Sequence, residues 1–112
     1  MIYYIAGPIT NIDDYKRPFK AIEKHLKGLG EVVINPAVLP LGLRSHASYM
    51  NICLPMLRES DAIVLIPGWH ISKGAKMEFI EAVRMGLTVH EADIDDFCRV
   101  IAINPVWEPE VF

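Results

Sequence analysis

The sequence predicts an α/β fold: a small, doubly wound domain of Rossmann-like or flavodoxin-like type, with a mostly parallel sheet of about five strands and helices on both faces. Short apolar runs alternate with segments of helical period along the chain, which is typical of this class. Three of the apolar runs end directly in Gly or Pro turn residues. The run at residues 62–66 is apolar and rich in β-branched side chains, as in a strand buried on both faces of a parallel sheet.

Composition and charge limit the number of domains and the kinds of partner that we expect. A chain of 112 residues suffices for one domain, here 1–112, with a single core. The net charge of −3, with both signs dispersed, argues against a nucleic-acid polymer or an anionic membrane as partner. The apolar runs are shorter than a membrane span and no secretory signal opens the chain, so we expect a cytoplasmic protein. The apolar fraction of 52% favours a homo-oligomer.

The chain opens with a strand at residues 2–6, which Gly7 and Pro8 end abruptly. A glycine in this position lets the backbone approach either a ligand or a neighbouring helix, and the sequence leaves both open. Neither the dinucleotide fingerprint GxGxxG nor a P-loop follows. The two commonest nucleotide-binding motifs are therefore excluded.

A helix and a second strand come next. The strand is predicted at residues 31–34 and ends at Asn35 and Pro36, and residues 37–45 read as a long loop, either a binding loop or a packed Ω-loop. The helix is predicted over residues 15–29, with an apolar face formed by Phe19, Ile22, Leu26 and Leu29.

The central strand at residues 62–66 lies between two predicted helices. The helix before it covers residues 46–60 and is either straight or kinked at Pro55. The helix after it is opened by Ser72 and ended by Gly86, and its apolar residues recur at three-residue spacing as Met77, Ile80 and Val83.

The end of the chain is predicted to contain two more strands. Residues 87–90 form the first, residues 91–96 an acidic connection, and residues 98–103 the second. The remaining residues, 104–112, read as an extended apolar tail that includes Val111 and Phe112. Such a tail packs across a surface, either its own or that of a partner.

Parallel strands place their carboxyl ends at one edge of the sheet, and ligands bind there. Glu78 lies in the early turns of the helix that follows the central strand. A carboxylate held ionised by the helix dipole suits a nucleophile or a general base. The alternative is that Glu78 and Glu81 are surface helix formers that complement the positive end of the helix.

Cysteine and histidine spacing predicts no metal site. Cys53 and Cys98 lie far apart without a CxxC partner, so we expect two reduced thiols that are mostly buried. None of the four histidines stands four positions from a second ligand on a helix. We therefore expect neither a metal nor a cofactor.

Several motifs together are more specific than any one of them. They are YIAGPIT at residues 4–10, INPAVLP at 34–40, YMNIC at 49–53, and SDAIVLIPGW at 60–69 followed by SKGAKMEF at 72–79. In this order they resemble the small phage and bacterial proteins of the DUF4406 type, which are grouped with the nucleoside 2-deoxyribosyltransferase-like superfamily. The resemblance covers about residues 2–90.

The resemblance implies an activity and roles for particular residues. That superfamily includes nucleoside deoxyribosyltransferases and 2′-deoxynucleoside 5′-phosphate N-hydrolases, in which a Glu carboxylate attacks C1′ of the sugar and forms a covalent glycosyl-enzyme. Glu78 stands at the position of that nucleophile. Ser72 stands at the position that contacts the 5′ group, although a Ser there also suits an ordinary N-cap. The resemblance adds Tyr4, Gly7, Asn35, Cys53, Trp69 and Gly74 as substrate-binding residues.

Two of these residues leave alternatives open. Trp69 could stack on a base or could cover the start of the helix. Cys53 stands where the enzymes carry an Asp that protonates or orients the leaving base, and a thiol is a poor substitute. Asn51, Tyr49 and His70 are the substitute donors considered. Asp61 is expected to act structurally, at the entrance of the central strand.

The leading hypothesis is an N-glycosidic enzyme that acts on a nucleoside or deoxynucleoside, or its 5′-monophosphate, by hydrolysis or base transfer. A second hypothesis is a catalytically silent module that binds or senses a nucleotide, and Cys53 favours it. A third is an interaction protein whose apolar tail mediates assembly, which is compatible with either of the others.

Overall fold

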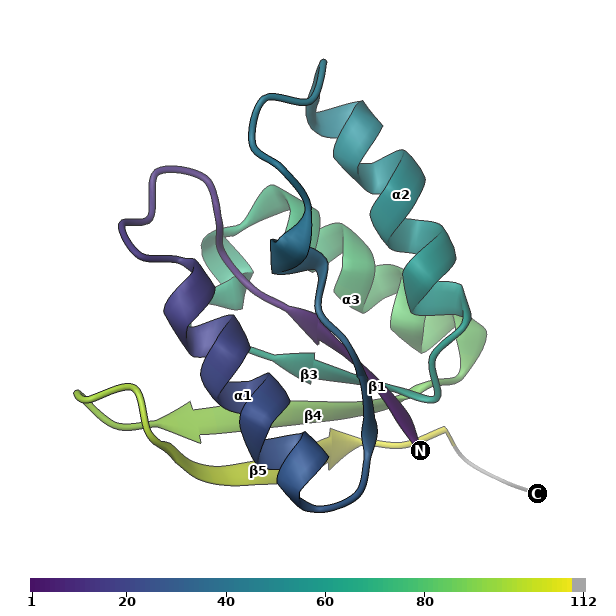
Figure 1. Ribbon diagram of the computed structural model, residues 1–112. Helices are drawn as coiled ribbons and strands as arrows, with labels where there is room; N and C mark the ends of the chain where they lie inside the picture. The colour runs from purple at the N-terminus through teal and green to yellow at the C-terminus, as the bar shows by residue number, and fades with distance from the viewer. Residues whose placement is uncertain (110–112) are drawn as a thin grey trace.

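A five-stranded sheet forms the centre of the computed structural model, which describes residues 1–109 (Figure 1). Strands β1 to β4 pair in parallel, and β5 runs antiparallel to β4 at one edge of the sheet. The predicted α/β class with a mostly parallel sheet is therefore confirmed. In the spatial order β2-β1-β3-β4-β5, the strands are β2 (Val32–Ile34), β1 (Ile2–Ala6), β3 (Ala62–Leu65), β4 (Thr88–Ile94) and β5 (Val100–Trp107).

Helices pack against both faces of this sheet (Figure 1). Successive side chains of a strand point to opposite faces, so Tyr4 and Ile5 of β1 enter different clusters of the core. Helix α1 packs on the Ile5 face, whereas α2 and α3 pack on the Tyr4 face. The helices are α1 (Lys16–Gly28), α2 (His46–Arg58) and α3 (Lys73–Met85), and two short 3₁₀ helices are η1 (Pro36–Val38) and η2 (Trp69–Ile71).

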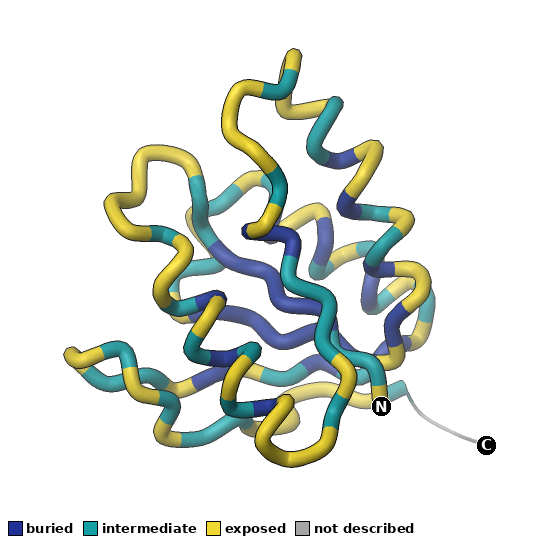
Figure 2. The backbone as a smooth tube through the Cα atoms, viewed as in Figure 1, coloured by how far each residue is buried: buried dark blue, intermediate teal, exposed yellow. Residues whose placement is uncertain are grey.

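The parallel strands bring their carboxyl ends to one edge of the sheet. The loops after β1, β2 and β3 all leave from this edge because the three strands run in the same direction. Figure 2 shows the central strands buried and much of these loops exposed. The predicted edge is confirmed as the place where these three loops gather.

Some predicted boundaries are wrong. Leu29 is 67% exposed and follows the end of α1, so the apolar face of that helix stops at Leu26. Strand β4 continues to Ile94 through most of the predicted acidic connection, and β5 extends to Trp107 into the predicted tail. The two strands pair with each other over this length, and backbone pairing outweighs the acidic composition. Val111 and Phe112 lie outside the described residues.

Helix α2 runs without interruption from His46 to Arg58 with Pro55 inside it. Its buried residues are Met50, Cys53 and Leu57, while Ile52 is 38% exposed. Within residues 1–109, none of the helices has the length and apolar character needed to cross a bilayer.

Candidate functional site

The buried face of α3 differs from the face that the sequence pattern predicts. Met77 and Ile80 are exposed, whereas Ala75, Glu78 and Ala82 are buried. The three- and four-residue steps between the buried positions keep them on one face of the helix. Small alanines let α3 approach the sheet closely, so this phase carries Glu78 into the core.

Glu78 is 6% exposed and contacts the first strand. Its carboxylate accepts a hydrogen bond from the hydroxyl of Tyr4, which is fully buried in β1. The interpretation of Glu78 as a surface helix former is therefore wrong. A carboxylate in the core, held by a side chain 74 positions away, is unusual enough to mark a candidate site.

Burial decides the charge state of this carboxyl group. Removal from water raises the pKa of Glu78 to about 7, and the hydrogen bond from Tyr4 opposes the shift only in part. The helix dipole was expected to favour the ionised form of Glu78, whereas burial shifts its pKa in the opposite direction. Burial and the neighbouring Glu78 raise the pKa of Tyr4, so its hydroxyl stays protonated and acts as the donor.

Cys53 of α2 completes the group of side chains around Tyr4. It is a free, buried thiol, as predicted, whereas Cys98 is free and half-buried. The Cys53 thiol interacts with the Tyr4 hydroxyl, and burial raises its pKa. One strand and two helices thus bring Tyr4, Cys53 and Glu78 together.

A cavity of about 410 Å³ lies at the N-terminus of α3, at the carboxyl edge of the sheet. It is lined by the loop after β1, by the first residue of α2 and by the start of α3. Ser72 belongs to this lining, and its hydroxyl oxygen accepts a hydrogen bond from the backbone N–H of Ala75 at 3.2 Å. Ser72 is therefore an N-cap, which was one of its two expected roles.

Gly74 lies between this cavity and Glu78. It lines the cavity and precedes Glu78 by four residues, so the two positions are one turn apart on the same face of α3. A Cβ atom at position 74 would lie 3.4 Å from Cε1 of His46 and 3.6 Å from Sδ of Met50. A side chain at this position would therefore project towards α2, beside the cavity that Gly74 lines.

Asn35 and Trp69, two other residues of the predicted set, lie outside this group. Asn35 uses its side-chain oxygen to accept a hydrogen bond from the N–H of Ala37 at 2.9 Å, and it lines a different cavity next to α1. Trp69 packs on Phe79 with ring centroids 4.9 Å apart and lines a third cavity, of about 230 Å³. Its position beside the start of α3 matches the second of its two expected roles.

Gly7 has a close neighbour in the protein itself. A Cβ atom at this position would lie 2.7 Å from Cβ of Ile66, at the end of β3. The sequence left open whether Gly7 lets the backbone approach a ligand or a neighbouring helix. The structure shows a close approach within the protein, to the end of a strand instead of a helix. Asp61 accepts a hydrogen bond from the N–H of Ile2 at 2.7 Å, in the structural role that was expected at the strand entrance.

The sequence reasoning missed several residues of the α3 cavity. The loop 8–12, His46 and Lys73 all line it, and none of them is among the predicted substrate-binding residues. A signal was present for the loop, because residues that directly follow a parallel strand reach the binding edge. His46 follows a long loop, and only the folded chain brings it to Gly74.

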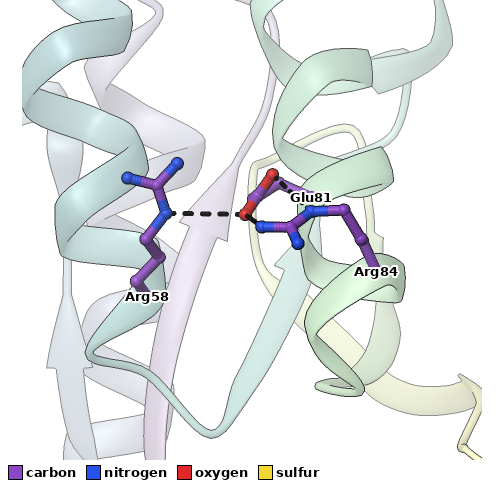
Figure 3. Close-up of polar contacts among 3 residues, drawn as sticks. All are labelled: Arg58, Glu81 and Arg84. Carbon is purple, nitrogen blue, oxygen red and sulfur yellow. Dashed lines mark hydrogen bonds and ion pairs between the residues drawn. The ribbon is translucent and has the colours of Figure 1, made fainter.

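Glu81 lies one turn beyond Glu78 and does behave as a surface residue. Its carboxylate pairs with Arg84 on the same helix and with Nε of Arg58 on α2 at 3.5 Å (Figure 3). The pKa of Glu81 is lowered, mainly by its hydrogen bond with Arg84. The two glutamates of α3 thus have opposite environments, and only Glu78 belongs to the candidate site.

Comparison with protein families gives one match. Residues 1–91 match the model of a family described as a domain of unknown function, DUF4406. A comparison with curated proteins gives no match. The matched region includes Tyr4, Cys53, Ser72 and Glu78 and ends before β5. Because the match spans most of the chain, this protein belongs to the DUF4406 family.

Proposed function

We propose that the protein is an N-glycosidic enzyme that acts on a nucleoside or deoxynucleoside, or its 5′-monophosphate, with Glu78 as the nucleophile. The observation that supports this most is the buried Glu78 carboxylate, oriented by Tyr4 one turn below a cavity. Active sites are places where burial shifts the pKa of a carboxyl group towards neutrality. The sequence resemblance to the nucleoside 2-deoxyribosyltransferase-like superfamily supports the same choice of residue.

The proposed reaction has two steps. The ionised Glu78 attacks C1′ of the sugar, the bond from C1′ to the base nitrogen breaks with its electron pair going to the base, and a glycosyl ester forms. Water or a second base then attacks C1′ and releases Glu78. Two displacements give retention of configuration at C1′. In this scheme Tyr4 orients the carboxylate and Ser72 contacts the 5′ group, whereas Trp69, which lines a different cavity, is given no contact with the base.

We also propose a fold type, an oligomeric state and a cellular location for the protein. The strand order β2-β1-β3-β4-β5 supports a doubly wound, flavodoxin-like domain of that superfamily. A homo-oligomer in the cytoplasm is proposed as well. An apolar groove of about 390 Å³ between α3 and β5, with Ile80, Val106 and Trp107 in its lining, supports self-association.

A catalytically silent nucleotide-binding module is the second candidate. Cys53 favours it, because its thiol has a raised pKa and is a weak acid beside the nucleophile. Such a module would bind a nucleotide at the α3 cavity without releasing the base. Saturable binding with no base release in long incubations would distinguish it from the enzyme.

The test is incubation with a panel of ribonucleosides, deoxynucleosides and their 5′-monophosphates, followed by chromatography for free base. We expect base release by the natural protein and none by Glu78→Gln, which keeps the shape of the side chain. Glu81→Gln is the matched control, because it makes the same change on the same helix at a half-buried glutamate that pairs with Arg58 and Arg84 instead of Tyr4. Full activity in Glu78→Gln would show that the nucleophile is assigned wrongly.

A further inference from the structure

The buried Glu78 carboxylate has no cationic partner among residues 1–109. Its hydrogen-bond partner is the neutral hydroxyl of Tyr4, and the described salt bridges do not include it. A buried carboxylate without a positive partner is costly to ionise, and the shift of its pKa to about 7 reflects this. A positively charged group that entered the site would supply the missing counter-charge.

The side chains around Glu78 lack a strong acid, whereas His46 and Lys73 belong to the lining of the α3 cavity. Glu78 is the one carboxyl group that is buried within the described part of the chain, and it is needed in its ionised form as nucleophile. The other proton-bearing side chains beside it are Tyr4 and Cys53, and the pKa of each is raised. The Tyr4 hydroxyl also already donates to Glu78. A neutral base that must be protonated to leave would find no effective donor in this group.

One class of N-glycoside meets both conditions. We propose that the site takes cationic N-glycosides, above all pyridinium nucleosides and nucleotides, whose positive ring pairs with Glu78 and whose base leaves without being protonated. This inference rests on the proposed function, and it names the substrate class. Two observations lead to it. The Glu78 carboxylate has no cationic partner among residues 1–109, and the group next to Tyr4 is the weakly acidic thiol of Cys53.

The chemistry balances without a proton donor. Glu78 attacks C1′, the bond from C1′ to the ring nitrogen breaks, and its electron pair neutralises the cationic ring, which leaves as a neutral base. The negative charge of Glu78 is used in the ester bond. Water then attacks C1′, the ester oxygen leaves with its electron pair, and the proton of the attacking water goes to solvent or to the released carboxylate.

The experiment compares substrates that differ in the charge of the base. Nicotinamide mononucleotide is paired with its neutral dihydro form, and 7-methyl-2′-deoxyguanosine is paired with 2′-deoxyguanosine. Base release is measured for each with the natural protein, and release by Glu78→Gln is subtracted as background. In whichever pair is turned over, we expect the cationic member to react at least about 100-fold faster than the neutral one. A general acid contributes at least this factor, and without one only the neutral substrate loses it.

The outcomes separate this inference from the proposed function. Release of neutral bases at a rate comparable with that of the cationic ones would overturn the inference and leave the glycosidic function standing. An absence of Glu78-dependent release from both pairs, with release from another member of the nucleoside panel, would overturn the inference alone. An absence of Glu78-dependent release from both pairs and from the whole panel would overturn the proposed function as well.

Cationic glycosides also lose their base faster in the absence of any enzyme, so a variant of the protein is needed to separate this effect from that of the site. Cys53→Asp adds a carboxyl group beside Tyr4, and we expect it to speed release of neutral bases by about 100-fold and to change release of cationic bases far less. Cys98→Asp is the matched control, since it makes the same replacement in the turn between β4 and β5. An equal effect of Cys53→Asp on both substrates would contradict the inference. If this variant does not fold, release by the natural protein is divided by the uncatalysed release of the same substrate, and the cationic member should still show the larger ratio. An equal or smaller ratio would contradict the inference.

Discussion

The hydroxyl of Tyr4 donates a hydrogen bond to the buried carboxylate of Glu78, and this contact joins the first strand of the sheet to its last helix. Tyr4 is fully buried and Glu78 nearly so, so water does not compete for the bond. The pKa of Glu78, about 7, therefore depends on both the burial of α3 and the donor on β1.

Stability is expected to fall with rising pH because of Glu78. Its pKa is about 7 in the folded protein, above the value near 4.3 of an exposed Glu, so the folded state binds more protons between these two values. The free energy of unfolding should decrease across this window by up to about 4 kcal/mol. In Glu78→Gln the decrease should vanish. Urea unfolding at a series of pH values measures it, and an unchanged slope in the variant would contradict the assignment.

Tyr4→Phe should raise the pKa of Glu78 further. The donor that favours the ionised form is lost, so the half-titration point of the carboxyl group moves to higher pH. Carbon NMR of the labelled Glu side chain follows this point without any need for activity. Unfolding should also become easier by about 1–3 kcal/mol, because a buried acceptor loses its partner. Tyr3→Phe, on the opposite face of β1, is the control and should leave the titration of Glu78 where it is.

Gly74→Ala should separate stability from activity. Alanine favours a helix over glycine, so we expect unfolding to become no easier, with a gain below about 1 kcal/mol. The new methyl group would lie 3.4 Å from His46 and would narrow the α3 cavity, which both residues line. Base release should therefore slow while thermal stability is kept. Activity equal to that of the natural protein would show that substrate does not pass Gly74.

Gly7→Ala should destabilise the protein. The added Cβ atom would lie 2.7 Å from Cβ of Ile66, so the ends of β1 and β3 must move apart. Such overpacking costs about 1–3 kcal/mol in the free energy of unfolding. Gly28→Ala in α1 is the control, because no atom lies within 4 Å of its added Cβ, and it should be neutral or stabilising. Chemical denaturation of both variants makes the comparison, and equal effects would rule out the contact with Ile66 as the cause.

Much of the fold was predictable because its signals are local. The turn residues at Gly7, Asn35 and Gly68 mark the ends of three strands, and the parallel arrangement of those strands follows from the intervening helices. The strand β5 was less predictable. Its residues alternate poorly and include Pro105, and it exists because β4 offers a partner along its whole length.

The candidate site was predictable only in part. Glu78 was selected by its place after the central strand and by resemblance, but its environment was misjudged because Met77 and Ile80 dominate the apolar pattern. Two alanines on the other face pack more closely against the sheet than these larger side chains could. Side-chain volume at the contact, rather than hydrophobicity along the helix, decided the phase.

The sequence by itself determined the order of strands and helices, the edge of the sheet at which the loops gather, and the position of Glu78 in the helix after the central strand. These follow from periodicity and turn chemistry, which depend on neighbouring residues. Only the tertiary structure decided that Glu78 is buried, that Tyr4 is its donor and that no cation accompanies it within residues 1–109. The charge state of Glu78 depends on the exclusion of water from its carboxyl group. That exclusion requires residues that are far apart in the sequence to pack together, as Tyr4 and Glu78 do across 74 positions.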